Sequence, residues 1–292
     1  MTSIISNMSA SALAGLSTTT ISKLKSSDIA GLRSDQVSAL TTAQVSAIAG
    51  SSLVSISTQA LALFNSAQVA ALSTASVVSL GTKVSSIATG AVSGMRSAQL
   101  AVMSYSQINS LSTKQVSALD TSMSYISTAQ ISSLTTDVIS SISTAGLMAL
   151  STLQRSKLST LQIQKLSSDQ VAALTSVEIA KLTTAQIAAL ETVDLNTFTS
   201  DEIQVLSSTQ MKALTSTQLN ALDPALLNDF TTLQLTNLTT LQVNKLSTDQ
   251  LNSLSEDQVG GLTSLQMGAL SSTQLNSLTS TQLAFVTTDQ IQ

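Results

Sequence analysis

Serine and threonine hydroxyls are the most abundant candidate nucleophiles in this chain, but the groups that would activate them are scarce. The sequence has no histidine and no cysteine, so it lacks the usual general base and the thiol nucleophile. Lys and Arg occur scattered between Lys23 and Lys245, and a Ser–Lys arrangement would depend entirely on the fold. We therefore expect no enzyme and assign no catalytic residue.

Motifs that bind phosphate, cofactors or metals are also absent. The chain has neither G-x-G-x-x-G nor G-x-x-x-x-G-K-[ST], which are the loops that cradle phosphates. Acidic residues such as Glu256 and Asp257 are too sparse for a calcium loop. We expect no cofactor, no cofactor-binding residue and no metal site.

Charge and hydropathy argue against nucleic acid and membranes as partners. Twelve Lys and Arg oppose sixteen Asp and Glu, for a net charge of −4, and aromatic residues make up 2% of the chain. No basic stripe is present to contact phosphates. Hydroxyl pairs interrupt every apolar run, so no membrane span is expected.

Apolar residues recur every eight positions along nearly the whole chain. In the second half the step is eight without exception, for example at Leu166, Leu174 and Leu182. Two intervals of seven break the pattern, between Leu80 and Ile87 and between Leu119 and Ile126. The unit is L-[S/T]-[S/T]-x-Q-[V/I/L]-x-x, and we call its first residue the anchor. A short repeat of this kind decides the fold class before any other feature does.

Each unit carries the signals that begin a helix. A hydroxyl residue followed three positions later by Gln is a capping box, and the flanking apolar residues form a hydrophobic staple. In one unit Ser167 and Gln170 form the box, and Leu166 and Val171 form the staple. The single proline, Pro224, falls on the first helical position, where its missing N–H costs nothing. The pattern predicts one short helix in every unit.

Such short helices must stack on one another, because one or two turns are unstable alone in water. We predict an all-α solenoid, or superhelix, of very short capped helices. A continuous helix is excluded because an eight-residue stripe drifts around its axis. A β-solenoid with a corner inside each unit stays open as the minority alternative.

Two parts of one continuous solenoid differ in regularity. Residues 1–150 are degenerate octapeptide repeats in which Gln is often replaced, as at Ala60, Ser76 and Gly146, whereas residues 151–292 are regular repeats. The last unit, Val286 to Gln292, stops inside a repeat. This end either frays, belongs to a longer chain or serves end-to-end assembly.

Three surface features invite functional interpretation. Several units place Leu at the second helical position (N2), where we expect exposure and possible lateral assembly contacts: Leu153, Leu161, Leu233, Leu241 and Leu265. Two pairs of these occupy adjacent units and would form small apolar patches, although scattered surface leucines are normal. Asn recurs six residues after the anchor, either as a ladder between stacked units or as compositional drift, the favoured interpretation: Asn196, Asn220, Asn228, Asn244, Asn252 and Asn276. Ice binding by the hydroxyl array is disfavoured, because the capping hydroxyls are committed to backbone.

The string from Leu40 to Ile48 (LTTAQVSAI) is similar to the first helix of the DNA-reading repeats of TAL effectors. Those repeats are about four times longer and carry a base-reading loop that is missing here, so the similarity implies only shared capping chemistry. The whole chain resembles bacterial low-complexity octapeptide-repeat proteins of unassigned function.

The favoured function is a structural protein that self-assembles into a filament, sheath or surface fibre. The alternative is a solenoid binding module or adhesin that recruits a protein or glycan through its irregular N-terminal half. The start, MTSIISNMSASALAG, has no positively charged segment and no clean apolar segment, so we do not expect it to be a standard signal peptide. A Ser/Thr/Gln-rich, Cys-free composition slightly favours the cell surface or exterior, reached by leaderless export, over a cytoplasmic filament.

Overall fold

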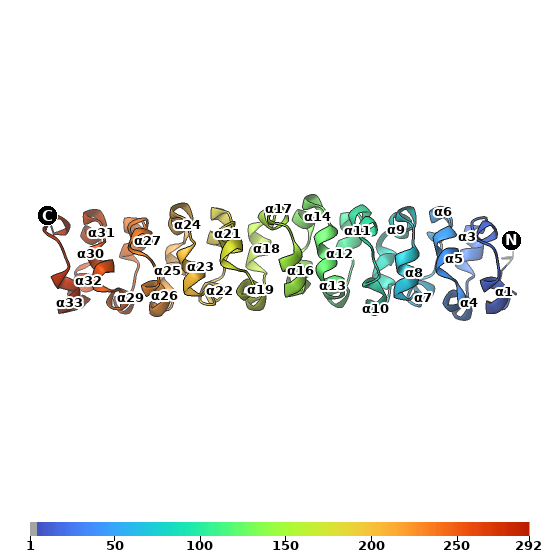
Figure 1. The fold of residues 1–292 in the computed structure, drawn as a ribbon, viewed down its shortest axis with the longest axis horizontal. Helices are drawn as coiled ribbons and strands as arrows, with labels where there is room; N and C mark the ends of the chain where they lie inside the picture. The colour runs from blue at the N-terminus through green and yellow to red at the C-terminus, as the bar shows by residue number, and fades with distance from the viewer. Residues whose placement is uncertain (1–4, 292) are drawn as a thin grey trace. The chain divides into compact units, whose positions relative to one another are not determined.

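The structure is a computed structural model that describes residues 5–291. Residues 1–4 and Gln292, the last residue of the incomplete final repeat, lie outside the described residues. The described residues form short helices joined by tight turns, with no strand among them (Figure 1). The all-α prediction is confirmed, and the β-solenoid alternative is wrong for this part of the chain.

The chain divides into two large parts, each made of many eight-residue repeats. We call these parts unit 1 (Met1–Lys157) and unit 2 (Leu158–Gln292). The boundary falls close to the change in regularity expected from the sequence after residue 150. Arg155 lies just before it and is the one charged residue at the position five after the anchor. The continuity of one solenoid across this boundary stays a prediction.

Unit 1 contains the following helices, with 3-10 helices written η: α1 (Ala10–Ala14), α2 (Thr18–Ile21), α3 (Ser26–Ala30), α4 (Ser34–Ala39), α5 (Thr42–Ala47), α6 (Gly50–Leu53), α7 (Thr58–Leu61), α8 (Ser66–Ala71), α9 (Thr74–Leu80), η1 (Gly81–Ser86), α10 (Thr89–Val92), α11 (Ser97–Val102), α12 (Tyr105–Asn109), α13 (Thr113–Leu119), η2 (Asp120–Tyr125), α14 (Thr128–Ser133), α15 (Thr136–Ser141), α16 (Thr144–Ala149) and α17 (Thr152–Ser156).

Unit 2 contains these helices: α18 (Thr160–Gln164), α19 (Ser168–Ala172), α20 (Ser176–Ile179), α21 (Thr184–Ala189), α22 (Thr192–Leu195), α23 (Ser200–Gln204), α24 (Ser208–Ala213), α25 (Ser216–Asn220), α26 (Pro224–Asn228), α27 (Thr232–Thr236), α28 (Thr240–Asn244), α29 (Thr248–Ser253), α30 (Glu256–Gly260), α31 (Ser264–Gly268), α32 (Ser272–Ser277), α33 (Ser280–Ala284) and η3 (Thr288–Gln290).

The predicted capping chemistry begins most of these helices, whereas α6, α10 and α22 begin without a side-chain cap. The N-cap Ser167 has extended backbone, and its hydroxyl accepts a hydrogen bond from the Gln170 N–H at 3.2 Å. The Gln170 side chain accepts in return from the Ser167 N–H at 2.8 Å. Asp223 caps α26 with Pro224 at its first position. The capping box and the role of the proline are confirmed.

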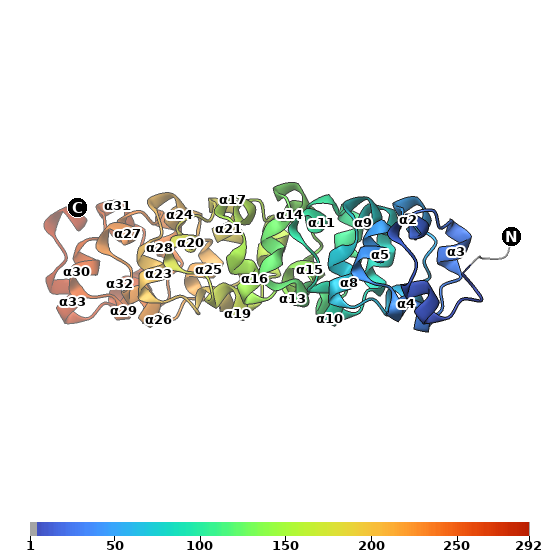
Figure 2. The ribbon, with the colours of Figure 1, turned by 45° about the vertical axis from the view of Figure 1, so that its right-hand side comes forward.

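Within each unit, a helix packs against the third helix after it in the chain, as α1 does against α4 and α28 against α31. Each turn of the coil therefore contains three helices, or 3 × 8 = 24 residues of regular repeat. Figure 2 shows helices distant in sequence lying side by side in both units. Consecutive helices consequently lie on different sides of the coil.

The core is made of two apolar side chains from most repeats, with exposed exceptions at Leu275 and Leu283. The residue five after the anchor is fully buried at Val37, Val171 and Ile187, and the anchors themselves are buried, as at Leu40 and Leu190. Full burial of one such side chain stabilises the fold by about 1.5–3 kcal/mol. These contacts between turns replace the stability that a helix of four to seven residues lacks on its own.

The two seven-residue intervals become 3-10 helices. α9 runs directly into η1 and α13 into η2, and Val84 and Met123 are buried in place of the usual fifth residue. The joints are Gly81 and Asp120, with φ of 53° and 46°, the two positive values in the described chain. A 3-10 helix, with i→i+3 hydrogen bonds, is tighter than an α-helix. The side chain four residues after the anchor therefore enters the core in place of the fifth, and the coil continues despite the missing residue.

Candidate functional site

The repeated Gln at the third helical position (N3) holds adjacent turns of the coil together. Its amide nitrogen donates to the carbonyls of residues 28 and 31 positions earlier, on the preceding turn. Gln250 donates to Leu222 at 2.9 Å and to Leu219 at 2.7 Å, while its oxygen accepts from the Ser247 N–H at 3.0 Å. We call this repeated arrangement the glutamine ladder.

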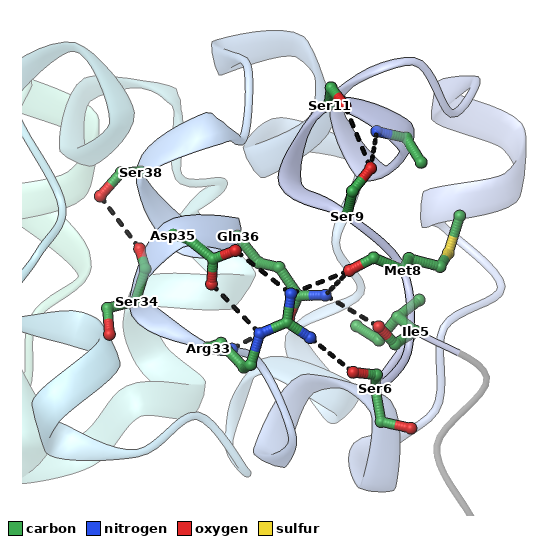
Figure 3. Close-up of polar contacts among 11 residues, drawn as sticks. Ile5, Ser6, Met8, Ser9, Ser11, Arg33, Ser34, Asp35, Gln36 and Ser38 are labelled. Atoms are coloured by element: carbon green, nitrogen blue, oxygen red, sulfur yellow. Dashed lines mark hydrogen bonds and ion pairs between the residues drawn. The ribbon is translucent and has the colours of Figure 1, made fainter.

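The earliest rung in the described chain shows the geometry (Figure 3). Gln36 donates to the Ile5 carbonyl at 2.8 Å and to the Met8 carbonyl at 3.0 Å. Arg33 also donates to the Met8 carbonyl, at 2.9 Å, and forms an ion pair with Asp35 at 3.2 Å. The Arg33 guanidinium holds the pKa of the exposed Asp35 carboxyl below its usual value.

The capping box alone does not explain the preference for Gln at N3. A Glu side chain can accept from the N-cap N–H equally well, as Glu202 does from Thr199 at 2.7 Å. An amide combines that acceptor with a donor for the preceding turn, whereas an ionised carboxylate only accepts. The frequent Gln, against occasional Glu, is thus a sequence signal for this second role, and the prediction from capping alone missed it.

Where Gln is missing, other side chains fill the place in different ways. Ser52 donates to the Leu24 carbonyl at 2.7 Å. In the shortened helix η1, the Lys83 ammonium donates to the carbonyls of Val54 at 2.7 Å and Ile56 at 3.0 Å. At Gly146 an added Cβ would lie 2.8 Å from the Asp120 carbonyl, so a side chain has no room there.

Some of the Asn side chains also link successive turns. Asn196 donates to the Ala221 carbonyl and accepts from the Asp223 N–H, both at 2.9 Å. Asn244 donates to the Ala269 carbonyl at 2.7 Å, and Asn109, outside the row predicted from the sequence, bridges to Ser133 and Thr135. Asn196 and Asn244, two of the six residues in the predicted row, thus form bonds of the kind that the ladder interpretation requires, since each joins one turn to the next.

The five leucines singled out from the sequence are all exposed on the surface. Within unit 2, the structure does not bring Leu233 and Leu241 onto one side, because consecutive helices lie on different sides of the coil. Leu233 on α27 therefore does not stack on Leu241 on α28. Leu153 lies in unit 1 and Leu161 in unit 2.

Instead, residues 24 positions apart lie on the same side of the coil, on successive turns. α22, α25, α28 and α31 pack successively against one another, and their N2 residues are Val193, Thr217, Leu241 and Leu265. We call these four residues the apolar column. The three hydrocarbon side chains are between 58% and 76% exposed. Val193 is missed by a prediction that counts only leucines at this position.

Carboxylates stand at both ends of the apolar column. The helix before α22 in this stack is α19, whose N2 residue is Asp169, and the helix after α31 is η3, whose N2 residue is Asp289. Each lies one repeat of the stack, 24 residues, from the nearest member of the column. The apolar surface is thus bounded by negative charge.

The described residues contain no group of His, Cys, Asp or Glu that could hold a metal ion. Across the same residues, no helix has the length and apolar character needed to cross a membrane.

A family model described as the ALTTAQ repeat matches residues 156–184, 187–224 and 229–264. The matched stretches cover less than half of the chain, and in them the chain is similar to ALTTAQ repeats. The matches lie in the regular part of the sequence and agree with the resemblance to octapeptide-repeat proteins of unassigned function. No curated protein matches the chain.

Proposed function

We propose that this ALTTAQ-repeat protein is a non-catalytic structural protein whose copies associate laterally through the apolar column of unit 2. The supporting observation is the stacking of Val193, Thr217, Leu241 and Leu265 on four successive turns. The N2 side chain takes no part in the glutamine ladder or the core. Its apolar character therefore serves neither of the interactions that hold the coil together.

A second copy of the chain is the partner that fits this surface. Apolar surface of this kind is characteristic of protein interfaces, and a copy presents the same side chains at the same spacing of one coil turn. Two copies can also pair after a shift of one or more whole turns. A staggered contact of that kind does not close on itself, so it extends into a filament or sheath rather than ending at a dimer.

The test uses the substitution that the repeat itself provides. Thr occupies the same position at Thr217, so Leu241→Thr with Leu265→Thr removes the hydrocarbon while keeping a residue the fold accepts. We expect the wild-type protein to form larger species as its concentration rises, measured by sedimentation velocity and negative-stain microscopy. The double variant should stay monomeric at the same concentrations.

Leu233→Thr is the matched control. It removes the same side chain from the same helical position, but α30, which packs against α27, has Asp257 at N2. Leu233 thus belongs to no apolar column, and its variant should assemble like the wild type. Monodisperse wild-type monomers at high concentration, or equal loss of assembly in Leu233→Thr, would contradict the proposal.

A further inference from the structure

Asp194 is an exception within the glutamine ladder. It occupies N3 of α22 and is 2% exposed, and its Oδ1 accepts from the Ser168 hydroxyl at 2.8 Å. Its second oxygen, Oδ2, is buried without a hydrogen-bond partner among the described residues. A buried polar atom without a partner is uncommon and costly in folded proteins.

The register of the ladder identifies what this carboxyl group faces. Two helices away, Gln210 of α24 donates to the carbonyls of Leu182 and Ile179, 28 and 31 residues earlier. The same separations from Asp194 lead to Leu166 and Ile163. An amide donates to such carbonyls, whereas an ionised carboxylate has no proton to donate and faces oxygens of like partial charge.

The acidic residues at N3 of neighbouring helices avoid this conflict. Glu178 and Glu202 are only half-buried, and each accepts from the backbone N–H of its own N-cap, Thr175 or Thr199. The Asp194 side chain is one methylene shorter and stays inside the coil. Among the described residues of unit 2, it is the buried acid with an unsatisfied oxygen.

The charged groups around Asp194 do not stabilise its ionised form. Glu191, the N-cap of its own helix, adds a negative charge, and α19 contributes Asp169 beside Ser168. α25, which packs on the other side, carries no charged side chain. Burial raises the pKa of Asp194, the charge of Glu191 raises it further, and the Ser168 hydrogen bond lowers it by less than burial raises it.

We propose that Asp194 makes the contact between α19 and α22 a pH-sensitive weak point of unit 2. When neutral, its carboxyl group donates to the Leu166 carbonyl and completes the ladder. When ionised, it leaves a buried charge against that carbonyl, and the turn loosens. Val193 of the apolar column is the preceding residue, so the weak point lies beside the proposed assembly surface.

The sign of the pH dependence follows from the direction of the shift. Because the folded-state pKa of Asp194 is raised above its usual value, the stabilising neutral form is present at low pH. That stabilisation is lost as pH rises through the folded-state pKa.

Hydrogen exchange of the full-length protein tests the proposal, with Asp194→Asn as the variant. Asparagine carries an amide donor at every pH. At neutral pH, amides of residues 190–198 should exchange about threefold to tenfold more slowly in Asp194→Asn than in the wild type, the factor that one hydrogen bond is worth. Near pH 4 the two proteins should exchange alike. Asp169→Asn, an exposed acid on the adjoining helix, should match the wild type at both pH values.

If the new amide in the Asp194→Asn variant did not form the expected hydrogen bond, it would itself loosen the turn. A titration of the wild type therefore provides a second measurement. Carboxyl ¹³C NMR should show Asp194 titrating above the usual range of an aspartic acid. The proposal is overturned if Asp194 titrates within or below the usual range of an aspartic acid, or if the exchange ratio between wild type and Asp194→Asn is independent of pH. The assembly test of the apolar column is separate, since it needs no change at Asp194.

Discussion

The two units use the same core but differ in how completely the glutamine ladder is built. In unit 2 the N3 residue is Gln in most helices, whereas unit 1 also places Ser, Ala, Val and Gly there, as at Ser52, Ala60, Val138 and Gly146. The residue five after the anchor is nevertheless buried in both units, for example at Val69 and Val243. Burial of apolar side chains is thus the common requirement, and the ladder is an addition that unit 1 partly omits.

The same contrast appears in how the units keep their turn length. In unit 2 the ladder bonds to anchor carbonyls span 28 residues, as from Gln242 to Leu214. In unit 1 the span falls to 27 where a seven-residue interval intervenes, as from Gln99 to Leu72. One residue can be removed from a turn because the 3-10 helix compensates for it. A solenoid held by nearest-neighbour packing tolerates such local changes.

The largest expected effect follows from removing a complete rung in unit 2. Gln250→Leu keeps the bulk of the side chain but removes three hydrogen bonds from a site that is 1% exposed. Buried groups left unsatisfied cost about 1–3 kcal/mol each, so we expect the free energy of unfolding to fall by about 2–5 kcal/mol. Urea unfolding followed by circular dichroism measures it.

Ser76→Ala in unit 1 is the counterpart of that variant. The Ser76 hydroxyl lies 3.4 Å from the Ile48 carbonyl, a long contact that contributes little, and the expected loss is about 1 kcal/mol or less. Equal losses at Gln250 and Ser76 would remove the distinction between a complete and a partial ladder.

An intermediate effect is expected at the first shortened interval. Gly81 has φ of 53° and ψ of −144°, and no atom lies within 4 Å of an added Cβ. Gly81→Ala therefore isolates backbone strain, and we expect it to lower the free energy of unfolding by about 1–3 kcal/mol. Thermal and urea unfolding of the full chain provide the measurement.

Gly90→Ala should have the opposite sign. Gly90 lies in α10 with open space around its Cα and no positive φ, so alanine should stabilise the protein by up to about 1 kcal/mol. If Gly81→Ala, like Gly90→Ala, did not lower the free energy of unfolding, then the positive φ at Gly81 would not be what allows unit 1 to lose a residue.

Much of this fold could be predicted from the sequence because its determinants are local. The cap, box and staple all lie within six residues, so Leu166, Ser167, Gln170 and Val171 identified the start of a helix without knowledge of the rest. Chain length per turn could not be obtained in this way. It depends on how the apolar side chains of three successive helices fill the centre of the coil, and the ladder partners of a residue such as Gln250 lie 28 and 31 positions away.

The surface shows the same limit. The exposure of Leu241 and Leu265 followed from their helical position, but their common face depends on three helices per turn. Without that number, Leu233 and Leu241 were grouped because they are adjacent in sequence. In the sequence, Asp194 is one of several replacements for Gln, and nothing local distinguishes its buried carboxyl from the half-buried Glu202.

The smallest expected effect concerns the Asn residues, which separate true links between turns from ordinary surface amides. Asn196→Ala removes two hydrogen bonds of 2.9 Å to the next turn, at an exposed site, and should cost about 1 kcal/mol. Asn252 is exposed at the equivalent position, and Asn252→Ala should change stability by less than about 0.5 kcal/mol. Urea unfolding of both variants measures the difference. If Asn252→Ala lowered the free energy of unfolding as much as Asn196→Ala, the helical position itself, rather than the bridge between turns, would favour asparagine. The Asn bridges would then add nothing to the regularity that distinguishes unit 2 from unit 1.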